Sequence, residues 1–176
     1  MDFKFKDDEN LSEAFEIIRD KVKDPKKGLG TNIFHFVSSL TPIVNVDLLI
    51  KNSDGQTLLS WRSDEFYGPG WHLPGGVVRF KEDPKVRVNK VAQNELGCDV
   101  TFFENPIHVR SRITEKRDIR GHFITLLYAC SLLSSPDVDR KSTTTNPFNG
   151  QWAWHDKAPK NLLTVHESFR KFIDEK

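Results

Sequence analysis

The sequence predicts a layered α/β fold of the α+β kind, an α/β/α sandwich with a mixed sheet and an added N-terminal helix. Strand-like segments fill the middle of the chain, and one helix with clear start and stop signals interrupts them. A second helical pattern closes the chain. The 176 residues suit one domain with a sizeable core, and the net charge of +1 gives no reason to expect nucleic acid or a membrane as partner.

The N-terminal segment predicts helices outside the main domain. Leu11, Phe15, Ile18 and Val22 recur at helical spacing, and this helix ends before Pro25. A second short helix is predicted over residues 32–39. We therefore expect residues 1–36 to form a helical arm and residues 37–176 to form the main domain.

The first strands of the domain form a hairpin. Residues 43–50 and 57–62 are apolar and rich in β-branched or aromatic side chains, and Asp54-Gly55 between them is typical of a hairpin turn. A loop rich in glycine and proline leads to a short strand over residues 71–74. The glycine pair that follows, Gly75-Gly76, is predicted to be a loop.

The central helix has recognisable ends. Asp83 suits the N-cap, Pro84 suits the first helical position, and Gly97 suits the C-cap. Further strands are expected in four segments, 99–103, 107–113, 122–132 and 151–155. A polar loop over 137–150 and a terminal helix over 165–173 complete the prediction.

Composition also bears on location and on the cysteines. No apolar run approaches the roughly 18 residues of a membrane span, and the N-terminus lacks the apolar core of a signal peptide. We therefore expect a cytoplasmic protein. Cys98 and Cys130 lie in apolar contexts and are predicted to be buried thiols.

Residues 75–98 resemble the Nudix box, the segment that binds metal and pyrophosphate in Nudix hydrolases. A lone glycine pair or a lone glutamate would be a plain turn or a solvated side chain, but several positions match together at the spacing of the box. The matching residues are Gly76, Glu82, Ala92, Glu95, Gly97 and Cys98.

Three positions depart from the box. Lys90 replaces its arginine, and Val91 and Asn94 replace two of its glutamates, so only Glu95 carries charge on the metal-binding face. A multi-metal cluster is therefore not expected. One Mg²⁺, with Mn²⁺ as a substitute, needs only one or two carboxylates beside water and phosphate oxygens. Glu82 is predicted to brace the loop.

Within the superfamily, the chain resembles the GDP-mannose mannosyl hydrolases over residues 37–173. The motifs that carry this likeness are residues 40–50, Trp61-Arg62, residues 71–76, His122-Phe123, Val165-His166 and Arg170. The resemblance implies a homodimer that cleaves a nucleotide sugar at the sugar carbon.

The resemblance also implies roles for single residues. Glu95 and the Gly75 carbonyl would hold Mg²⁺, and Arg62 would stabilise the departing diphosphate. Asp47 would contact the sugar or the nucleotide. His122 is a candidate substrate contact, with a hydrogen-bonded core residue as the alternative.

Two positions of the subfamily are not matched. Its arginine after the glycine pair is Val77 here, and Arg79 is a candidate catalytic replacement because it lies two residues on in an extended segment. Its general-base histidine aligns with Asn149. The base is thus unassigned, and spacing does not choose among Asp137, Asp139, Gln151 and His155.

The expected function is Mg²⁺-dependent hydrolysis of a nucleotide sugar resembling GDP-mannose, by attack at the anomeric carbon. One alternative is a conventional Nudix pyrophosphatase that acts on another nucleoside diphosphate derivative. The other is a degenerate domain that binds nucleotide sugars without turnover. The basic stretch 110–120 is open to three interpretations, a contact to a nucleotide diphosphate, a contact to a partner subunit or a solvated hairpin tip.

Overall fold

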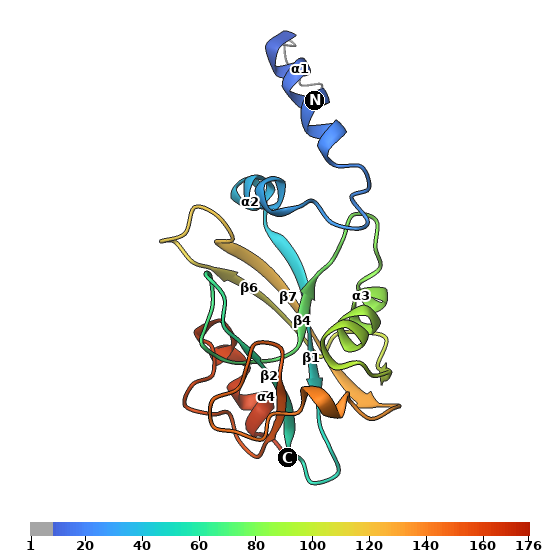
Figure 1. Cartoon of the computed structure of the whole chain (residues 1–176), viewed down its shortest axis with the longest axis vertical. Coiled ribbons are helices and arrows are strands. Elements are labelled where there is room, and N and C mark those ends of the chain that lie inside the picture. The colour runs from blue at the N-terminus through green and yellow to red at the C-terminus, as the bar shows by residue number, and fades with distance from the viewer. Residues whose placement is uncertain (1–8) are drawn as a thin grey trace.

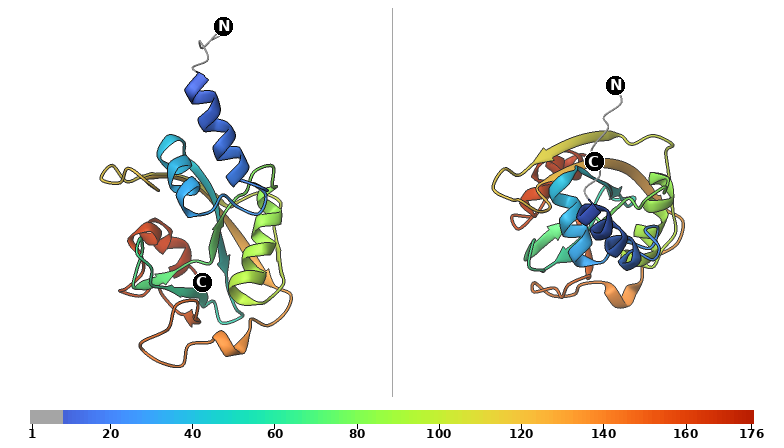
Figure 2. Two further views of the ribbon diagram at one scale, coloured as in Figure 1. Left: turned by 45° about the horizontal axis from the view of Figure 1, so that its top comes forward. Right: turned by 90° about the horizontal axis from the view of Figure 1, so that it is seen from above.

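The computed structural model describes residues 9–176, which form two sheets with helices packed around them (Figure 1). The first two helices are α1 (Glu9–Lys21) and α2 (Thr31–Leu40), as predicted. α1 stands away from the body, whereas α2 lies across one end of the larger sheet (Figures 1 and 2). The expected boundary after residue 36 falls inside α2.

The larger sheet is mixed, as predicted. Its long central strands, β1 and β7, run parallel, and all other pairs are antiparallel. β4 lies at one edge next to β1, while β5 and β6 both pair with β7 on its far side. The strands are β1 (Ile43–Ile50), β4 (Gly75–Val77), β5 (Val100–Phe102), β6 (His108–Ile113) and β7 (His122–Leu132).

The smaller sheet has three antiparallel strands. It consists of β2 (Thr57–Arg62), β3 (Gly70–His72) and β8 (Trp152–His155), with β2 in the centre. Leu59 from β2 and Trp71 from β3 bury their side chains together with Leu49 from β1. The smaller sheet thus packs against one face of the larger one and sets the end of β2 beside β4.

The central helix packs on the opposite face and ends beside the glycine pair. α3 (Pro84–Val91) starts at Asp83, whose side chain accepts a hydrogen bond from the Lys85 N–H at 2.8 Å. A π-helical turn (Ala92–Leu96) continues α3, and Gly97 ends it with a φ of 65°. The predicted helix and both of its caps are therefore confirmed.

The end of the chain differs from the single helix predicted over 165–173. A 3₁₀ segment (Thr164–Phe169) precedes the short helix α4 (Arg170–Asp174). In a 3₁₀ segment, residues three apart lie on the same side, and His166 and Phe169 are both buried. The tighter turn therefore delivers both side chains to the interior.

Two further sequence expectations concern the core and the membrane. Cys98 and Cys130 are buried free thiols, as predicted. No helix in residues 9–176 has the length and apolar character needed to cross a membrane.

Candidate active site

The glycine pair forms strand β4 rather than the predicted loop, because it pairs with β1 in the register Asp47 to Gly75 and Val46 to Gly76. Both glycines meet close neighbours. A Cβ on Gly75 would lie 2.1 Å from Asp47 Oδ1, and a Cβ on Gly76 would lie 2.8 Å from Val91 Cγ2. Because neither glycine has a side chain, β4 can lie close to Asp47 on one side and close to α3 on the other.

Glu95 faces this strand from the π-helical turn. Its Oε1 accepts a hydrogen bond from the Gly75 N–H at 3.3 Å, and burial raises the pKa of its carboxyl to about 7. In a strand, the C=O of a residue points to the same side as its N–H, so the Gly75 carbonyl also faces away from β1. Glu95 and this carbonyl are thus suitably placed to share one cation.

The other two box positions offer no carboxylate. Val91 is 4 % exposed and packs in the core, and Asn94 lines a cavity beside Glu95. Residues 9–176 contain no group of three or more His, Cys, Asp or Glu side chains arranged to hold a metal. Glu95 is therefore the one carboxylate among these three box positions, and carboxylate and carbonyl oxygens are the ligand type that Mg²⁺ prefers.

Asp47 lies on the other side of Gly75 and is only 3 % exposed. Its Oδ1 accepts a hydrogen bond from Asn45 Nδ2 at 3.1 Å, and Asn45 Oδ1 in turn accepts one from the Thr125 hydroxyl at 2.8 Å. Burial, followed by the nearby charge of Glu95, raises the pKa of Asp47 to about 8. The two carboxyl groups therefore oppose each other's ionisation unless a cation lies between them.

His166 joins Asp47 from the 3₁₀ segment. His166 Nδ1 accepts a hydrogen bond from the Leu73 N–H at 2.8 Å, so the proton of the neutral ring is assigned to Nε2. This nitrogen lies 3.5 Å from Asp47 Oδ2. Burial keeps the pKa of His166 well below its usual value. Sequence reasoning did not include His166 among the site residues, although the Val165-His166 motif was the signal that could have placed it here.

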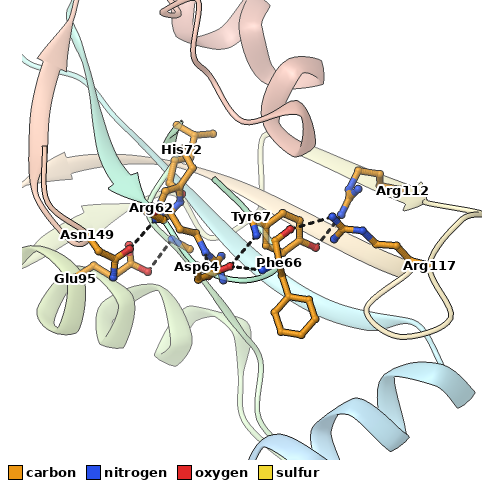
Figure 3. Close-up of polar contacts among 12 residues, drawn as sticks. Arg62, Asp64, Phe66, Tyr67, His72, Glu95, Arg112, Arg117 and Asn149 are labelled. Atoms are coloured by element: carbon orange, nitrogen blue, oxygen red, sulfur yellow. Dashed lines mark hydrogen bonds and ion pairs between the residues drawn. The ribbon is translucent and has the colours of Figure 1, made fainter. Parts of the chain in front are cut away.

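Arg62 and His72 line the space beside both carboxylates. Arg62 ends β2, pairs with Asp64 and stacks on the Tyr67 ring, with its Cζ 4.9 Å from the ring centroid (Figure 3). His72 Nδ1 bonds to the Leu73 carbonyl at 2.7 Å, and burial lowers its pKa to about 4. Its neutral ring therefore leaves Nε2 as an acceptor.

These side chains line two cavities that share Arg62, His72 and Gly75. The Asp47 cavity has a volume of about 100 Å³, and its other polar walls are Asn45, Asp47, Arg112, Arg120, Thr125 and His166. The Glu95 cavity has a volume of about 630 Å³, and its other polar walls include Asn94, Glu95, Asp139, Arg140, Asn149 and Gln151. A ligand that contacts the shared residues could extend into both cavities.

Two predicted site residues lie apart from these cavities. His122 Nε2 lies 2.9 Å from the Ser111 hydroxyl, and its ring lines a separate cavity at the end of α2. The Arg79 guanidinium packs near Gly28 in a third cavity beside α2. The structure thus brings together Asp47, Arg62, Gly75 and Glu95 without these two.

Glu82 holds the segment between β4 and α3. Its carboxylate accepts hydrogen bonds from the Arg79 N–H at 2.9 Å, from Arg87 Nε at 2.8 Å and from Lys90 Nζ at 2.9 Å. Burial alone would raise its pKa, but these donors hold the pKa at about 2. Glu82 is therefore saturated with donors and braces the loop, as the sequence predicts.

The candidates for a general base are spread over two places. Asn149 lines the Glu95 cavity, but its Oδ1 accepts a hydrogen bond from the Ser63 N–H at 2.9 Å. Asp139 and Gln151 line the same cavity. Asp137 and His155 line neither cavity. Asp137 pairs with Arg140, and the His155 ring packs on Trp71.

The NUDIX domain family matches residues 41–175, which is most of the chain and includes every residue of both cavities. The chain belongs to the Nudix family. Solved structures of Nudix hydrolases share the fold of this chain. A MutT Nudix hydrolase from Burkholderia pseudomallei superposes with a TM-score of 0.55 at 21 % identity, over 76 % of this chain and 95 % of that one.

Two further proteins are similar to this chain. A Nudix family hydrolase from Clostridium perfringens has a TM-score of 0.54 at 16 % identity, over 74 % of this chain and 93 % of that one. The low-salt glycan biosynthesis protein Agl8 of Haloferax volcanii is 27 % identical over 118 residues, which cover 65 % of this chain and 74 % of that protein. Nudix hydrolases generally use a divalent metal and act on nucleotide derivatives.

Proposed function

We propose that this Nudix hydrolase cleaves a nucleotide sugar of the GDP-mannose type, with Mg²⁺, to a nucleoside diphosphate and free sugar by attack of water at the anomeric carbon. The observation that carries the proposal is that Glu95 is the only carboxylate among the three glutamate positions on the metal-binding face of the box helix. Glu95 lies beside Gly75, while Val91 is part of the core and Asn94 is neutral. Attack at phosphorus usually relies on metals that lower the pKa of the attacking water. One metal suits a simpler task, the neutralisation of a diphosphate leaving group.

The diphosphate is proposed to lie where the two cavities meet. Arg62, His72 and Gly75 line both cavities, so a group bound there contacts the arginine and the metal ligands at once. The guanidinium fork of Arg62 suits phosphate oxygens. Mg²⁺ bound by Glu95 and the Gly75 carbonyl would supply the remaining positive charge.

The sugar is proposed to occupy the Asp47 cavity. This cavity is the smaller of the two, and its polar groups include Asn45, Asp47, Thr125 and His166, which suit sugar hydroxyls. The larger Glu95 cavity would then take the nucleoside. The relation to a protein of glycan biosynthesis in Haloferax volcanii supports a sugar-linked substrate.

Hydrolysis in ¹⁸O-labelled water tests the chemistry. We expect the label in the free sugar and none in the nucleoside diphosphate. Label in a phosphate group would show attack at phosphorus and so a conventional Nudix pyrophosphatase. Mg²⁺-dependent binding without product, even after long incubation, would show a binding domain without turnover.

A homodimer is part of the proposal and is supported by α1. This helix stands away from the body (Figure 1). The side chains of Leu11 and Phe15 are exposed on it. Light scattering after gel filtration should give twice the chain mass, and the mass should fall to that of one chain in the variant Leu11→Ser with Phe15→Ser. A monomeric wild-type protein would contradict this part of the proposal.

A further inference from the structure

Three arginines of the β6–β7 hairpin lie around the Tyr67 ring, and no sequence motif of the box accounts for them; Figure 3 shows two of them, Arg112 and Arg117. The Cζ atoms of Arg117 and Arg120 lie 4.8 and 5.3 Å from the Tyr67 ring centroid. Arg112 Nη2 lies 3.5 Å from the Tyr67 hydroxyl. Together with Arg62 on the same ring, these side chains place four guanidinium groups around Tyr67, a residue that lines the Asp47 cavity.

The contacts of these arginines are to neutral groups. Arg112 Nη1 donates to the Thr114 hydroxyl at 2.7 Å, and Arg117 Nη2 donates to the Phe66 carbonyl at 3.0 Å. The Arg120 guanidinium packs over the Phe66 ring at 4.7 Å. Within the described part of the chain, none of the three forms an ion pair with a carboxylate.

Arg117 and Arg120 also have unsatisfied donors. Arg117 Nη1 and Arg120 Nε are buried and have no hydrogen-bond partner. In addition, Arg120 has a φ of 54°, which is uncommon for a residue other than glycine. Its backbone N–H is held by the Ser38 hydroxyl at 3.0 Å. Backbone strain of this kind together with unpaired donors is typical of a binding site.

Only Arg112 and Arg120 of the three line the Asp47 cavity, where they lie with Arg62. Asp47 is the one carboxylate in this lining, and it already contacts Asn45 and His166. Arg62 has its own partner in Asp64. With Arg62 paired to Asp64, the guanidinium groups of Arg112 and Arg120 remain as two positive charges in the lining beside the single carboxylate of Asp47.

We propose that the glycosyl group bound in the Asp47 cavity is itself anionic, a nucleotide-linked uronic acid whose carboxylate is bound by Arg112 and Arg120. This inference rests on the proposed function, since it assigns the sugar to the Asp47 cavity. A carboxylate fits the forked donors of two arginines, and it would engage guanidinium groups that otherwise contact only neutral groups. A neutral hexose would offer these two guanidinium groups only neutral hydroxyl acceptors.

The test compares matched pairs of substrates that differ only at the sugar C6, either a hydroxymethyl or a carboxylate group. UDP-glucose is paired with UDP-glucuronate, and GDP-mannose with GDP-mannuronate. Calorimetric binding with Mg²⁺ should give about tenfold or tighter binding of the uronate in at least one pair, the gain expected of a charge-assisted hydrogen bond. UDP and UTP are measured alongside, because a third phosphate could use the same arginines.

Variants then locate the effect. Arg112→Gln should weaken binding of the uronate much more than binding of the neutral sugar, so that most of the preference for the uronate is lost. Arg110→Gln is the matched control, because Arg110 lies two residues away on β6, is exposed and does not line the Asp47 cavity. Retained strand content in circular dichroism shows that both variants fold.

The outcomes separate this inference from the proposed function. Equal binding within both pairs, or a preference for UTP over UDP that exceeds any preference for a uronate, would overturn the inference and leave the proposed hydrolysis intact. Tight binding of a uronate without hydrolysis would overturn the proposed function alone. Failure of every nucleotide sugar to bind would overturn both.

Discussion

Replacement of Glu82 and of Glu95 by glutamine should separate a structural glutamate from a metal ligand. The two carboxylates have opposite surroundings. Glu82 accepts hydrogen bonds from three donor residues and has a pKa of about 2, whereas Glu95 accepts one long hydrogen bond from Gly75 and burial raises its pKa to about 7. Glu82→Gln should therefore lower stability, and Glu95→Gln should abolish Mg²⁺ binding with little loss of stability.

The size of the first effect follows from burial. The side chain of Glu82 is 6 % exposed and that of its partner Arg87 is 10 % exposed, so removal of the carboxylate leaves a buried guanidinium without its counterion. Loss of one partner of a buried ion pair costs about 3 to 5 kcal/mol, and we expect about 3 kcal/mol because the glutamine oxygen still accepts a hydrogen bond. For a domain of this size, that corresponds to a fall in Tm of about 6 to 12 °C.

Urea denaturation and calorimetry give the stability, and isothermal titration with Mg²⁺ gives the metal affinity. Wild-type protein is measured under the same conditions as both variants. Unchanged stability in Glu82→Gln together with loss of Mg²⁺ binding would refute the division of roles, because Glu82 would then be the ligand. A large loss of stability in Glu95→Gln would refute it as well.

Three further predictions concern the same region. Gly76→Ala should cost about 1 to 3 kcal/mol of stability, because the added methyl group meets Val91, and addition of Val91→Ala should restore part of this loss. A double-mutant cycle by urea denaturation measures the coupling, and additive stability losses of the two substitutions would contradict the contact. Arg62→Lys should lower kcat about 100-fold, because lysine lacks the forked donors for phosphate oxygens and the planar group that stacks on Tyr67. An unchanged kcat in steady-state kinetics would rule out a role of Arg62 at the leaving group. Because the pKa of Glu82 is lower in the folded protein than its usual 4.5, the ionised carboxylate stabilises the fold above pH 4.5, and this contribution is lost as the pH falls towards 2. The difference in unfolding free energy between wild type and Glu82→Gln should therefore narrow over that range. A constant difference would contradict the assignment.

Much of the fold could be predicted because its signals are local. The Asp54-Gly55 turn, the apolar strands β1 and β2 and the caps of α3 at Asp83 and Gly97 each depend on neighbouring residues, and all are present in the structure. β4 was missed because its two glycines have low strand propensity. Its pairing with β1 is a contact across the sheet that the local sequence does not encode.

The site could be predicted only in part. The box spacing placed Gly75 and Glu95 side by side, because one helix and one strand bring them together. By contrast, His166 comes from the end of the chain and Arg112 from a hairpin, so their arrival at the Asp47 cavity depends on tertiary packing. Arg79 and His122 were predicted as site residues from their residue types and sequence positions, but in the structure both line other cavities.

The packing of Gly76 against Val91 also limits how the chain can change. Position 91 is where a typical Nudix box has a glutamate, but here it is 4 % exposed and lies against the β4 backbone, with Val91 Cγ2 only 2.8 Å from where a Cβ on Gly76 would be. The single step Val91→Glu would put a longer, charged side chain into the core without a partner. A multi-metal cluster at the usual box positions would therefore require several coordinated substitutions in this chain, because no single change at position 91 leaves the packing against β4 intact.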